Sequence, residues 1–198
     1  QGPFDNASII WGSSLYYAFY DAPEKLHKLM GIIAGTILAV LEEHRRIDGC
    51  SLQEQGGQWN HLGGLCVRND SSVNLSTQQY TEFAQPYDQQ LLEPYGGWIH
   101  FCGKAHWWKA LLGLSNLKGI NPYQGEFYDM LGMYETCEQA GVPIVQWTTP
   151  LDEKCRERIR TGFSRVFWTR DYDNACRARD HLHATGHVDG FQIPPETV

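Results

Sequence analysis

Short apolar runs alternate with amphipathic helical stretches along the chain, and this alternation constrains the fold more than any other feature. Strands that alternate with helices of about 10 to 15 residues are typical of right-handed βαβ units, which build a parallel sheet. The chain is therefore predicted to be an α/β protein. Its 198 residues contain no Pro/Gly-rich linker, so a single domain over residues 1–198 is expected. Strands are predicted at residues 47–52, 97–102, 117–121, 142–147 and 165–168.

Helix signals fall between these strands. Asp21 is a candidate N-cap for a long helix, because the apolar residues that follow it recur at spacings of three and four. Residues 76–79 (STQQ) have the form of a capping box, which predicts that a helix begins there. Further helices are predicted at residues 107–112, 126–140, 152–161 and 173–184.

Composition excludes several classes of function. With 16 basic and 23 acidic residues the net charge is −7, and no basic stripe is present, so nucleic acid is not the expected partner. The longest apolar stretch, residues 29–41, contains two glycines and is shorter than the ~20 residues that span a bilayer, so no membrane association is expected. The six cysteines lie far apart without a CxxC pair, which indicates reduced thiols and a cytoplasmic protein.

The most informative chemistry lies in residues 97–103 (GWIHFCG). His100 and Cys102 are two positions apart on a predicted strand, so they project from the same face near the strand's exit. Imidazole and thiolate are ligands that zinc prefers, and two of them from one strand end form half of a tetrahedral site. The alternative is a core cysteine beside a hydrogen-bonded histidine, and the residues alone leave both interpretations open.

Other polar residues follow predicted strands or stand near their ends. Glu54 is a candidate proton carrier, and Asp70 a candidate hydrogen-bonding residue; a solvated loop acid and a loop cap are the respective alternatives. Asn121 and Gln146 offer uncharged hydrogen-bonding groups at two later strand ends. Catalytic roles are therefore assigned to Glu54 and Asp70, and substrate-binding roles to Asn121 and Gln146.

Several motifs occur in the order found in the uroporphyrinogen decarboxylase superfamily, which the chain resembles over residues 1 to about 150. The opening residues 1–8 (QGPFDNAS) are similar to its QGP segment, and Asp70 with residues 75–87 to its D…LSP..F.EF..PY stretch. Residues 96–103 resemble its HxCG strand and residues 117–121 its L.GIN segment. The resemblance implies a (β/α)8 TIM barrel, present here as a partial barrel from about its third strand onward.

The H-x-C pair looks like that of the cobamide-dependent methyltransferase branch. There, the resemblance implies, zinc activates a thiol that takes the methyl group of a corrinoid, and a corrinoid protein is a possible partner. His100 and Cys102 would be zinc ligands, and Asp5 in the opening motif would contact a small-molecule substrate. The third ligand of that branch is a cysteine near the eighth strand, but residues 166–170 contain none. The sequence leaves His61, His106 or Cys176 to complete the site.

Three alternatives remain. Within the same superfamily, the chain would decarboxylate uroporphyrinogen or a smaller acid in porphyrin biosynthesis. A non-catalytic binding protein on a degenerate barrel is the alternative from another class. A glycoside hydrolase is less favoured, because no second carboxylate accompanies Glu54 at the late strand. A barrel that lacks strands has open sheet edges, so self-association through those edges is also expected.

Overall fold

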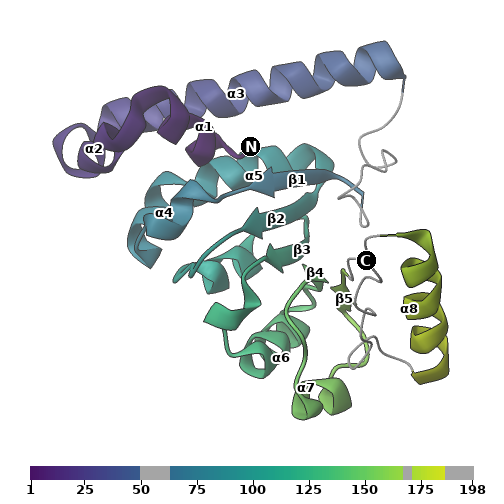
Figure 1. Cartoon of the computed structure of the whole chain (residues 1–198). Coiled ribbons are helices and arrows are strands. Elements are labelled where there is room, and N and C mark those ends of the chain that lie inside the picture. Colours follow the sequence, from purple (N-terminus) through teal and green to yellow (C-terminus); the bar gives the residue numbers. More distant parts are fainter. Residues whose placement is uncertain (50–62, 167–170, 186–198) are drawn as a thin grey trace, which may run out of the picture.

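The computed structural model describes residues 1–49, 63–166 and 171–185, and its centre is a five-stranded parallel sheet (Figure 1). The strands lie side by side in chain order, and each neighbouring pair is parallel. The predicted α/β class with a parallel sheet is thus confirmed. The strands are β1 (Leu65–Arg68), β2 (Gly97–Phe101), β3 (Leu117–Pro122), β4 (Ile144–Trp147) and β5 (Phe163–Arg165).

Helices precede the sheet and connect its strands. In the described residues, three α-helices come before β1, and α3 packs against α1, α2 and α5. Short 3-10 turns follow β1, β2 and β3. The helices are α1 (Pro3–Trp11), α2 (Leu15–Asp21), α3 (Pro23–Asp48), α4 (Thr77–Phe83), α5 (Gln85–Tyr95), α6 (Met130–Ala140), α7 (Glu153–Arg158) and α8 (Tyr172–Thr185).

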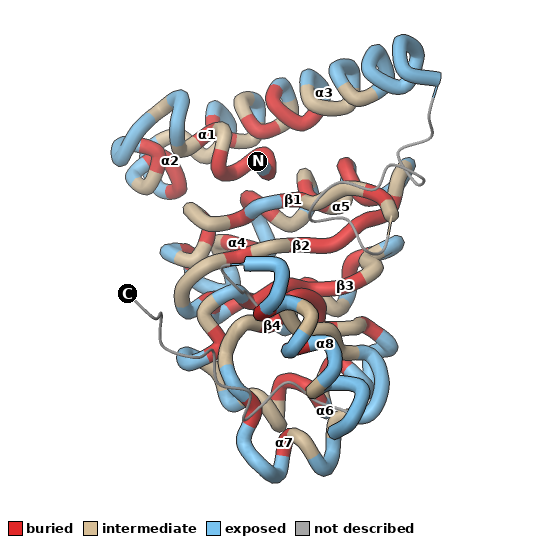
Figure 2. The backbone as a smooth tube through the Cα atoms, turned by 45° about the vertical axis from the view of Figure 1, so that its right-hand side comes forward, coloured by how far each residue is buried: buried red, intermediate tan, exposed pale blue. Residues whose placement is uncertain are grey.

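The two faces of the sheet have different surroundings. Val67, Ile99 and Ile120 point to one face and belong to the apolar core that the strands share with helices α1 to α7. Trp98 and His100 alternate with Ile99 along β2 and therefore point to the opposite face, where they line a cavity. Figure 2 shows that buried residues are concentrated along the strands and on the inner sides of the helices. One face of the sheet thus provides stability, and the other carries the polar groups.

The helix predicted after Asp21 is present, but it differs from the prediction at both ends. Asp21 is the last residue of α2, and Ala22 precedes α3 without any side-chain cap, so the predicted N-cap is wrong. Pro23 occupies the first turn, as expected. The predicted strand at residues 47–52 is also wrong in its described part, because α3 continues to Asp48.

Two local features account for the longer helix. Glu42 and Glu43 pair with Arg45 and Arg46 on the same exposed helix surface, which favours continued helix. Gly49 then ends the helix in the left-handed conformation, with φ of 65°. The first strand in the described part of the chain is Leu65–Arg68, a segment that the sequence pattern did not single out. Helices α1 and α2 were not predicted either.

The remaining helices and strands are of the predicted type, but several begin or end at other residues than predicted. The capping box is confirmed: Gln79 N–H donates to Ser76 Oγ at 3.2 Å, and Ser76 N–H donates to Gln79 Oε1 at 2.9 Å. Strand β4 begins only after Pro143, which cannot donate to the ladder, and β5 begins two residues before the predicted strand. Helix α6 begins at Met130 rather than at residue 126, because the Asp129 carboxylate accepts from Gly132 N–H and caps it there. Residues 108–113 form a 3-10 turn.

Close strand contact at the start of β2 requires glycine. Gly97 has φ of 153°, and a Cβ there would lie 2.2 Å from the carbonyl oxygen of Leu65. Any side chain would push β1 away from β2, so this residue sets the position of the strand pair that carries the candidate site. Across the described ranges, no helix is long and apolar enough to cross a membrane.

Candidate metal centre

Three potential metal ligands meet where β1 and β2 end. Asp70 follows β1, His100 lies on β2, and Cys102 comes directly after β2. The Nε2 atom of His100 lies 3.3 Å from Asp70 Oδ1 and 3.3 Å from Cys102 Sγ, and all three ligand atoms fall within 4.8 Å of one another. Parallel strands in register bring these residues together: Arg68 pairs with His100, so Asp70 lies level with Cys102. The described residues thus form a group that can hold a metal ion.

Asn121 determines which imidazole nitrogen faces this group. Its Nδ2 donates to the carbonyl oxygen of Val145 at 2.6 Å, so its Oδ1 must face His100. His100 Nδ1 lies 2.6 Å from that oxygen and therefore carries the proton. In the neutral ring, the lone pair is then on Nε2, beside Asp70 and Cys102. A histidine whose other nitrogen is held in this way is typical of protein metal sites.

Asp70 is held by contacts on both of its carboxylate oxygens. Oδ1 accepts from the backbone N–H of Cys102 at 3.0 Å, and Oδ2 accepts from Arg68 Nη2 at 2.7 Å. Burial acts to raise the pKa of Asp70, but the contacts with Cys102, His100 and Arg68 outweigh it and leave the pKa below its usual value. The residue is therefore a carboxylate at neutral pH, as a metal ligand must be.

Residues 1–8, the opening motif, hold the Asp70 loop in place through hydrogen bonds to its backbone. Gly2 N–H donates to the carbonyl oxygen of Arg68 at 2.7 Å, and a Cβ on Gly2 would lie 2.4 Å from Asn69 Oδ1. The buried Asp5 carboxylate accepts from the backbone N–H groups of Asp70 at 3.1 Å and Ser71 at 2.7 Å. Burial raises the pKa of Asp5 despite these bonds. The substrate-binding role predicted for Asp5 is untested, and its observed contacts position Asp70.

Cys102 is held in its neutral form by its surroundings. Burial and the neighbouring Asp70 carboxylate raise the pKa of the Cys102 thiol to about 12. At neutral pH the sulfur is therefore a thiol unless a cation compensates the negative charge. A bound divalent metal provides such compensation, and it converts a coordinating cysteine to the thiolate.

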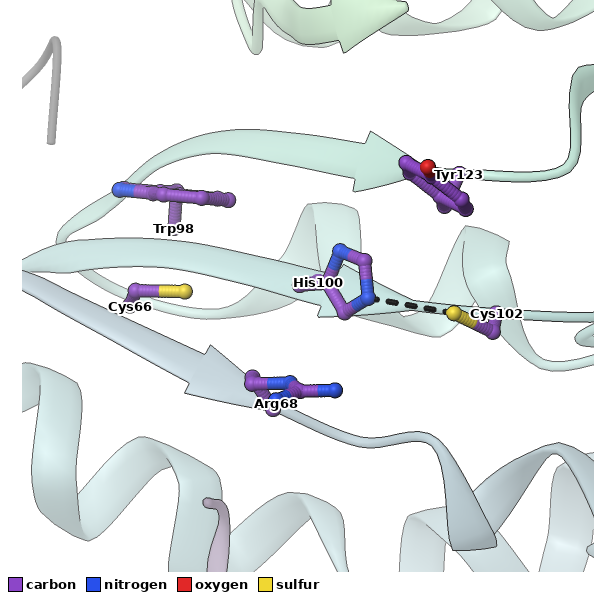
Figure 3. Close-up of a pocket in the computed structure, with 6 residues that line it drawn as sticks. All are labelled: Cys66, Arg68, Trp98, His100, Cys102 and Tyr123. Carbon is purple, nitrogen blue, oxygen red and sulfur yellow. Dashed lines mark hydrogen bonds between the residues drawn. The ribbon is translucent and has the colours of Figure 1, made fainter. Parts of the chain in front are cut away.

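The metal-ligand group opens into a cavity of about 280 Å³ on the face of β1 and β2 opposite Val67 and Ile99. Figure 3 shows the side chains of Cys66 and Arg68 from β1 on one side and those of Trp98 and His100 from β2 on the other. The Tyr123 ring, just after β3, lies 5.8 Å from the His100 ring between centroids. Burial raises the pKa of Cys66 to about 11, so this second thiol of the cavity is neutral. The cavity is mainly apolar and has one guanidinium at its edge.

The structure brings some of the predicted residues together and separates others. His100, Cys102 and Asp70 meet, and Asn121 hydrogen-bonds to His100. Gln146 is buried on β4 and belongs neither to the ligand group nor to the lining of the cavity. Glu54 and His61 lie outside the described residues. The candidate third ligands His106, which is exposed, and Cys176, on α8, do not belong to the group; Asp70 provides the third donor instead.

Sequence reasoning assigned no site role to four cavity residues: Cys66, Arg68, Trp98 and Tyr123. Cys66 and Arg68 are two residues apart and so share a face of a strand, but this can be inferred only once Leu65–Arg68 is known to be a strand. Tyr123 follows Asn121 by two residues, which is the same spacing that links His100 to Cys102, so a face argument at the end of β3 identifies it.

Replacing Asn121 is expected to weaken metal binding without removing a ligand. Asn121→Leu has similar volume but cannot accept from His100 Nδ1, so the ring orientation and tautomer are lost. We expect zinc affinity to fall by about 10- to 100-fold, which isothermal titration calorimetry measures. Asn121→Asp keeps the acceptor and should retain more affinity than Asn121→Leu. Equal losses in both variants would contradict the positioning role.

Comparison of this chain with protein-family models, with curated proteins and with solved structures finds no match in any of the three.

Proposed function

We propose that this chain is a zinc-dependent, methyltransferase-like enzyme of the uroporphyrinogen decarboxylase type, and that its sheet is part of a (β/α)8 barrel. The sequential order of five parallel strands supports the barrel, because neighbouring strands of such a barrel follow one another in the chain. The position of the site also supports it, since active sites of these barrels gather at the carboxyl ends of the strands. The motif order described above is the further support.

The proposal rests mainly on the donor set of Asp70, His100 and Cys102. Oxygen, nitrogen and sulfur ligands in one half-buried group suit zinc, and three protein ligands leave a fourth position for a substrate atom. Zinc, when bound, acts as a Lewis acid that stabilises the thiolate of a coordinated thiol substrate at neutral pH. Such a thiolate is the nucleophile required to accept a methyl group from a corrinoid.

The residues of the chain have separate tasks in this proposal. Asp70, His100 and Cys102 hold the ion, while Asn121 and Asp5 fix the orientation of His100 and the Asp70 loop. Arg68 compensates the Asp70 carboxylate and keeps it ionised. Trp98 and Tyr123 form cavity walls that keep water from the reacting thiol and leave room for the substrate.

Arg68 favours a second candidate, decarboxylation of uroporphyrinogen or a smaller acid. Its side chain lines the cavity and is half exposed, and in the described part of the chain its hydrogen bond runs from Nη2 to Asp70. A guanidinium beside an open cavity is suited to bind a substrate carboxylate. Conversion of uroporphyrinogen to coproporphyrinogen by the purified chain would favour this candidate, and its absence together with thiol methylation would exclude it.

Metal analysis of purified variants tests the leading proposal. We expect about one zinc ion per chain, and we expect Cys102→Ala to lower zinc affinity by about 100-fold or more, since loss of a mere supporting residue already costs 10- to 100-fold. Cys66→Ala is the matched control, because Cys66 lines the same cavity without belonging to the ligand group. Zinc-loaded protein should also demethylate methylcobalamin in the presence of a small thiol. Absence of zinc, or equal binding by Cys102→Ala, would overturn the proposal.

A further inference from the structure

Cys102 lies where the chain leaves the sheet. Strand β2 ends at Phe101, and Gly103 has φ of 77°, in the left-handed region, so the chain turns away directly after Cys102. Figure 3 shows the Cys102 sulfur pointing back toward His100, whose Nε2 is 3.3 Å away. The contacts described so far join Cys102 to the other two members of the ligand group, Asp70 and His100. The place of its sulfur therefore also depends on what holds the turn that follows it.

The hydroxyl of Tyr128 holds both sides of this turn. It donates to the carbonyl oxygen of Gly103 at 2.7 Å and accepts from the backbone N–H of Ala105 at 2.7 Å. The Tyr128 ring contacts the Phe101 ring in an edge geometry, with centroids 6.2 Å apart, so the hydroxyl is anchored to the last residue of β2. One side chain thus fixes residues 103–105 relative to the end of the strand.

Gln124 provides a second contact to the same turn. Its Oε1 accepts from the backbone N–H of Gly103 at 2.5 Å, so both backbone polar groups of this glycine bond to side chains from the segment after β3. That segment is itself fixed, because Tyr123 N–H donates to the Phe101 carbonyl oxygen at 3.0 Å and the Thr148 hydroxyl donates to the Tyr123 carbonyl oxygen at 2.9 Å. The turn is therefore bonded to a part of the chain that is anchored both on β2 and on the loop after β4.

We propose that Tyr128 and Gln124 are positioning residues, which place the Cys102 sulfur in the ligand group by fixing the turn after it. Their role in metal binding rests on the proposed function, because Cys102 is a ligand only in that function. Ligands must be held within about 0.5 Å of the productive geometry, and loss of an outer contact that orients a ligand lowers metal affinity by about 10- to 100-fold. Asn121, from the same segment, orients His100, so this segment places two of the three ligands.

Tyr128→Phe tests this role in the zinc-binding chain. It keeps the ring and its contact with Phe101 but removes both hydrogen bonds to the turn, so we expect zinc affinity to fall by about 10- to 100-fold in isothermal titration calorimetry. Tyr134→Phe is the matched control, because Tyr134 is a buried tyrosine of α6 whose hydroxyl also bonds to a backbone carbonyl, that of Thr161 at 3.1 Å, but not to this turn. It should change zinc affinity by less than about threefold.

Gln124 offers a conservative pair of variants. Gln124→Glu keeps an oxygen that accepts from Gly103 N–H, whereas Gln124→Leu removes that acceptor. We expect Gln124→Leu to bind zinc about tenfold more weakly than the wild type, and Gln124→Glu to lose less than about threefold. Equal losses in the two variants would contradict the positioning role of Gln124.

Alkylation of the metal-free chain tests the position of the sulfur without zinc. The Cys102 side chain is half-buried beside His100, so a fixed turn limits its access to a reagent, and a loosened turn exposes it. We expect Tyr128→Phe to raise the rate of Cys102 alkylation by iodoacetamide about tenfold, followed by mass spectrometry, and to leave Cys66 in the same cavity unchanged. Tyr134→Phe should match the wild type at both cysteines, and circular dichroism confirms that the variants fold.

The outcomes separate this role from the proposed function. A metal-free Tyr128→Phe chain in which Cys102 reacts at the wild-type rate would overturn the positioning role, whether or not the wild type binds zinc. A gain that also occurs at Cys66 or in Tyr134→Phe would overturn it too, because it would reflect a general loosening of the fold. Absence of zinc from the wild type would instead end the proposed function, and the alkylation rates would still decide whether Tyr128 holds the sulfur in place.

Discussion

Asp88→Asn is expected to remove most of a stability loss that the wild type undergoes as the pH rises from 5 to 8. Asp88 lies fully buried on α5, where Oδ2 accepts from Asn69 Nδ2 at 2.6 Å and from the Tyr80 hydroxyl at 2.7 Å. Its other oxygen, Oδ1, is buried and has no hydrogen-bond partner among the described residues. Burial raises the pKa of Asp88 to about 7, against these two hydrogen bonds, which act to lower it.

The direction of the effect follows from proton linkage. The folded pKa is above the value of 3.8 for an unfolded aspartate, so the folded protein holds a proton that the unfolded chain has lost. The stability contributed by the neutral carboxyl is therefore full below about pH 4 and disappears as the pH passes 7. Between pH 5 and 8 the loss is about 3 kcal/mol, at 1.36 kcal/mol for each pKa unit.

Urea unfolding at pH 5 and pH 8 measures this difference. The wild type should lose about 3 kcal/mol of unfolding free energy that Asp88→Asn retains. Asp21→Asn, at the exposed end of α2, is the matched control and should follow the wild type at both pH values. Parallel pH profiles for the wild type and Asp88→Asn would show that Asp88 is ionised in the folded protein at pH 5.

The second large effect is expected for Trp107→Ala, at about 3 to 5 kcal/mol of unfolding free energy. The Trp107 side chain is fully buried and stacks on Tyr80, with ring centroids 4.0 Å apart and an interplanar angle of 9°. Its edge contacts Phe101, the last residue of β2. Its Nε1–H donates to the carbonyl oxygen of Ser72 at 2.7 Å, in the turn that follows Asp70. The indole therefore ties the Asp70 turn to the core.

Two further substitutions separate packing from hydrogen bonding. Trp107→Phe keeps much of the ring contact but removes one of two hydrogen bonds to the Ser72 carbonyl, which still accepts from Leu75 N–H at 2.9 Å, so a smaller loss of about 0.5 to 1.5 kcal/mol is expected. Trp108→Ala, at the neighbouring half-buried residue, should cost less than Trp107→Ala. Denaturant unfolding followed by far-ultraviolet circular dichroism compares the variants. Equal losses for Trp107→Ala and Trp108→Ala would contradict the anchoring role.

The candidate site was predictable in part because His100 lies on β2 and Cys102 directly follows it, two residues later. The period of two along a strand is a local property, so the common face of His100 and Cys102 follows from their spacing alone. Asp70 was recognised as a polar residue of interest, but its place beside His100 depends on the pairing of β1 with β2. The sequence therefore proposed other third ligands, of which His106 and Cys176 lie outside the group.

Local sequence signals also explain which elements were found. Each of these signals spans only a few neighbouring residues: the capping box at Ser76, the glycine after Ala140, and the apolar runs of β2 and β3. Strand β1 was missed because Leu65–Arg68 is short and ends in an exposed arginine. The end of α3 was misplaced because residues 47–52 (IDGCSL) were interpreted as a short strand, while the ion pairs that prolong the helix involve side chains three residues apart.

The sequence by itself determined the α/β class, the parallel sheet and the shared face of His100 and Cys102, because these depend on periodicity along a few residues. The tertiary structure decided that Asp70 completes the group, that Asn121 orients the imidazole and that Asp5 braces the loop. Those contacts join residues 21 to 66 positions apart. They form only when the strands pair in the observed register and the N-terminal helix packs against the loop after β1, and no local sequence pattern specifies either arrangement.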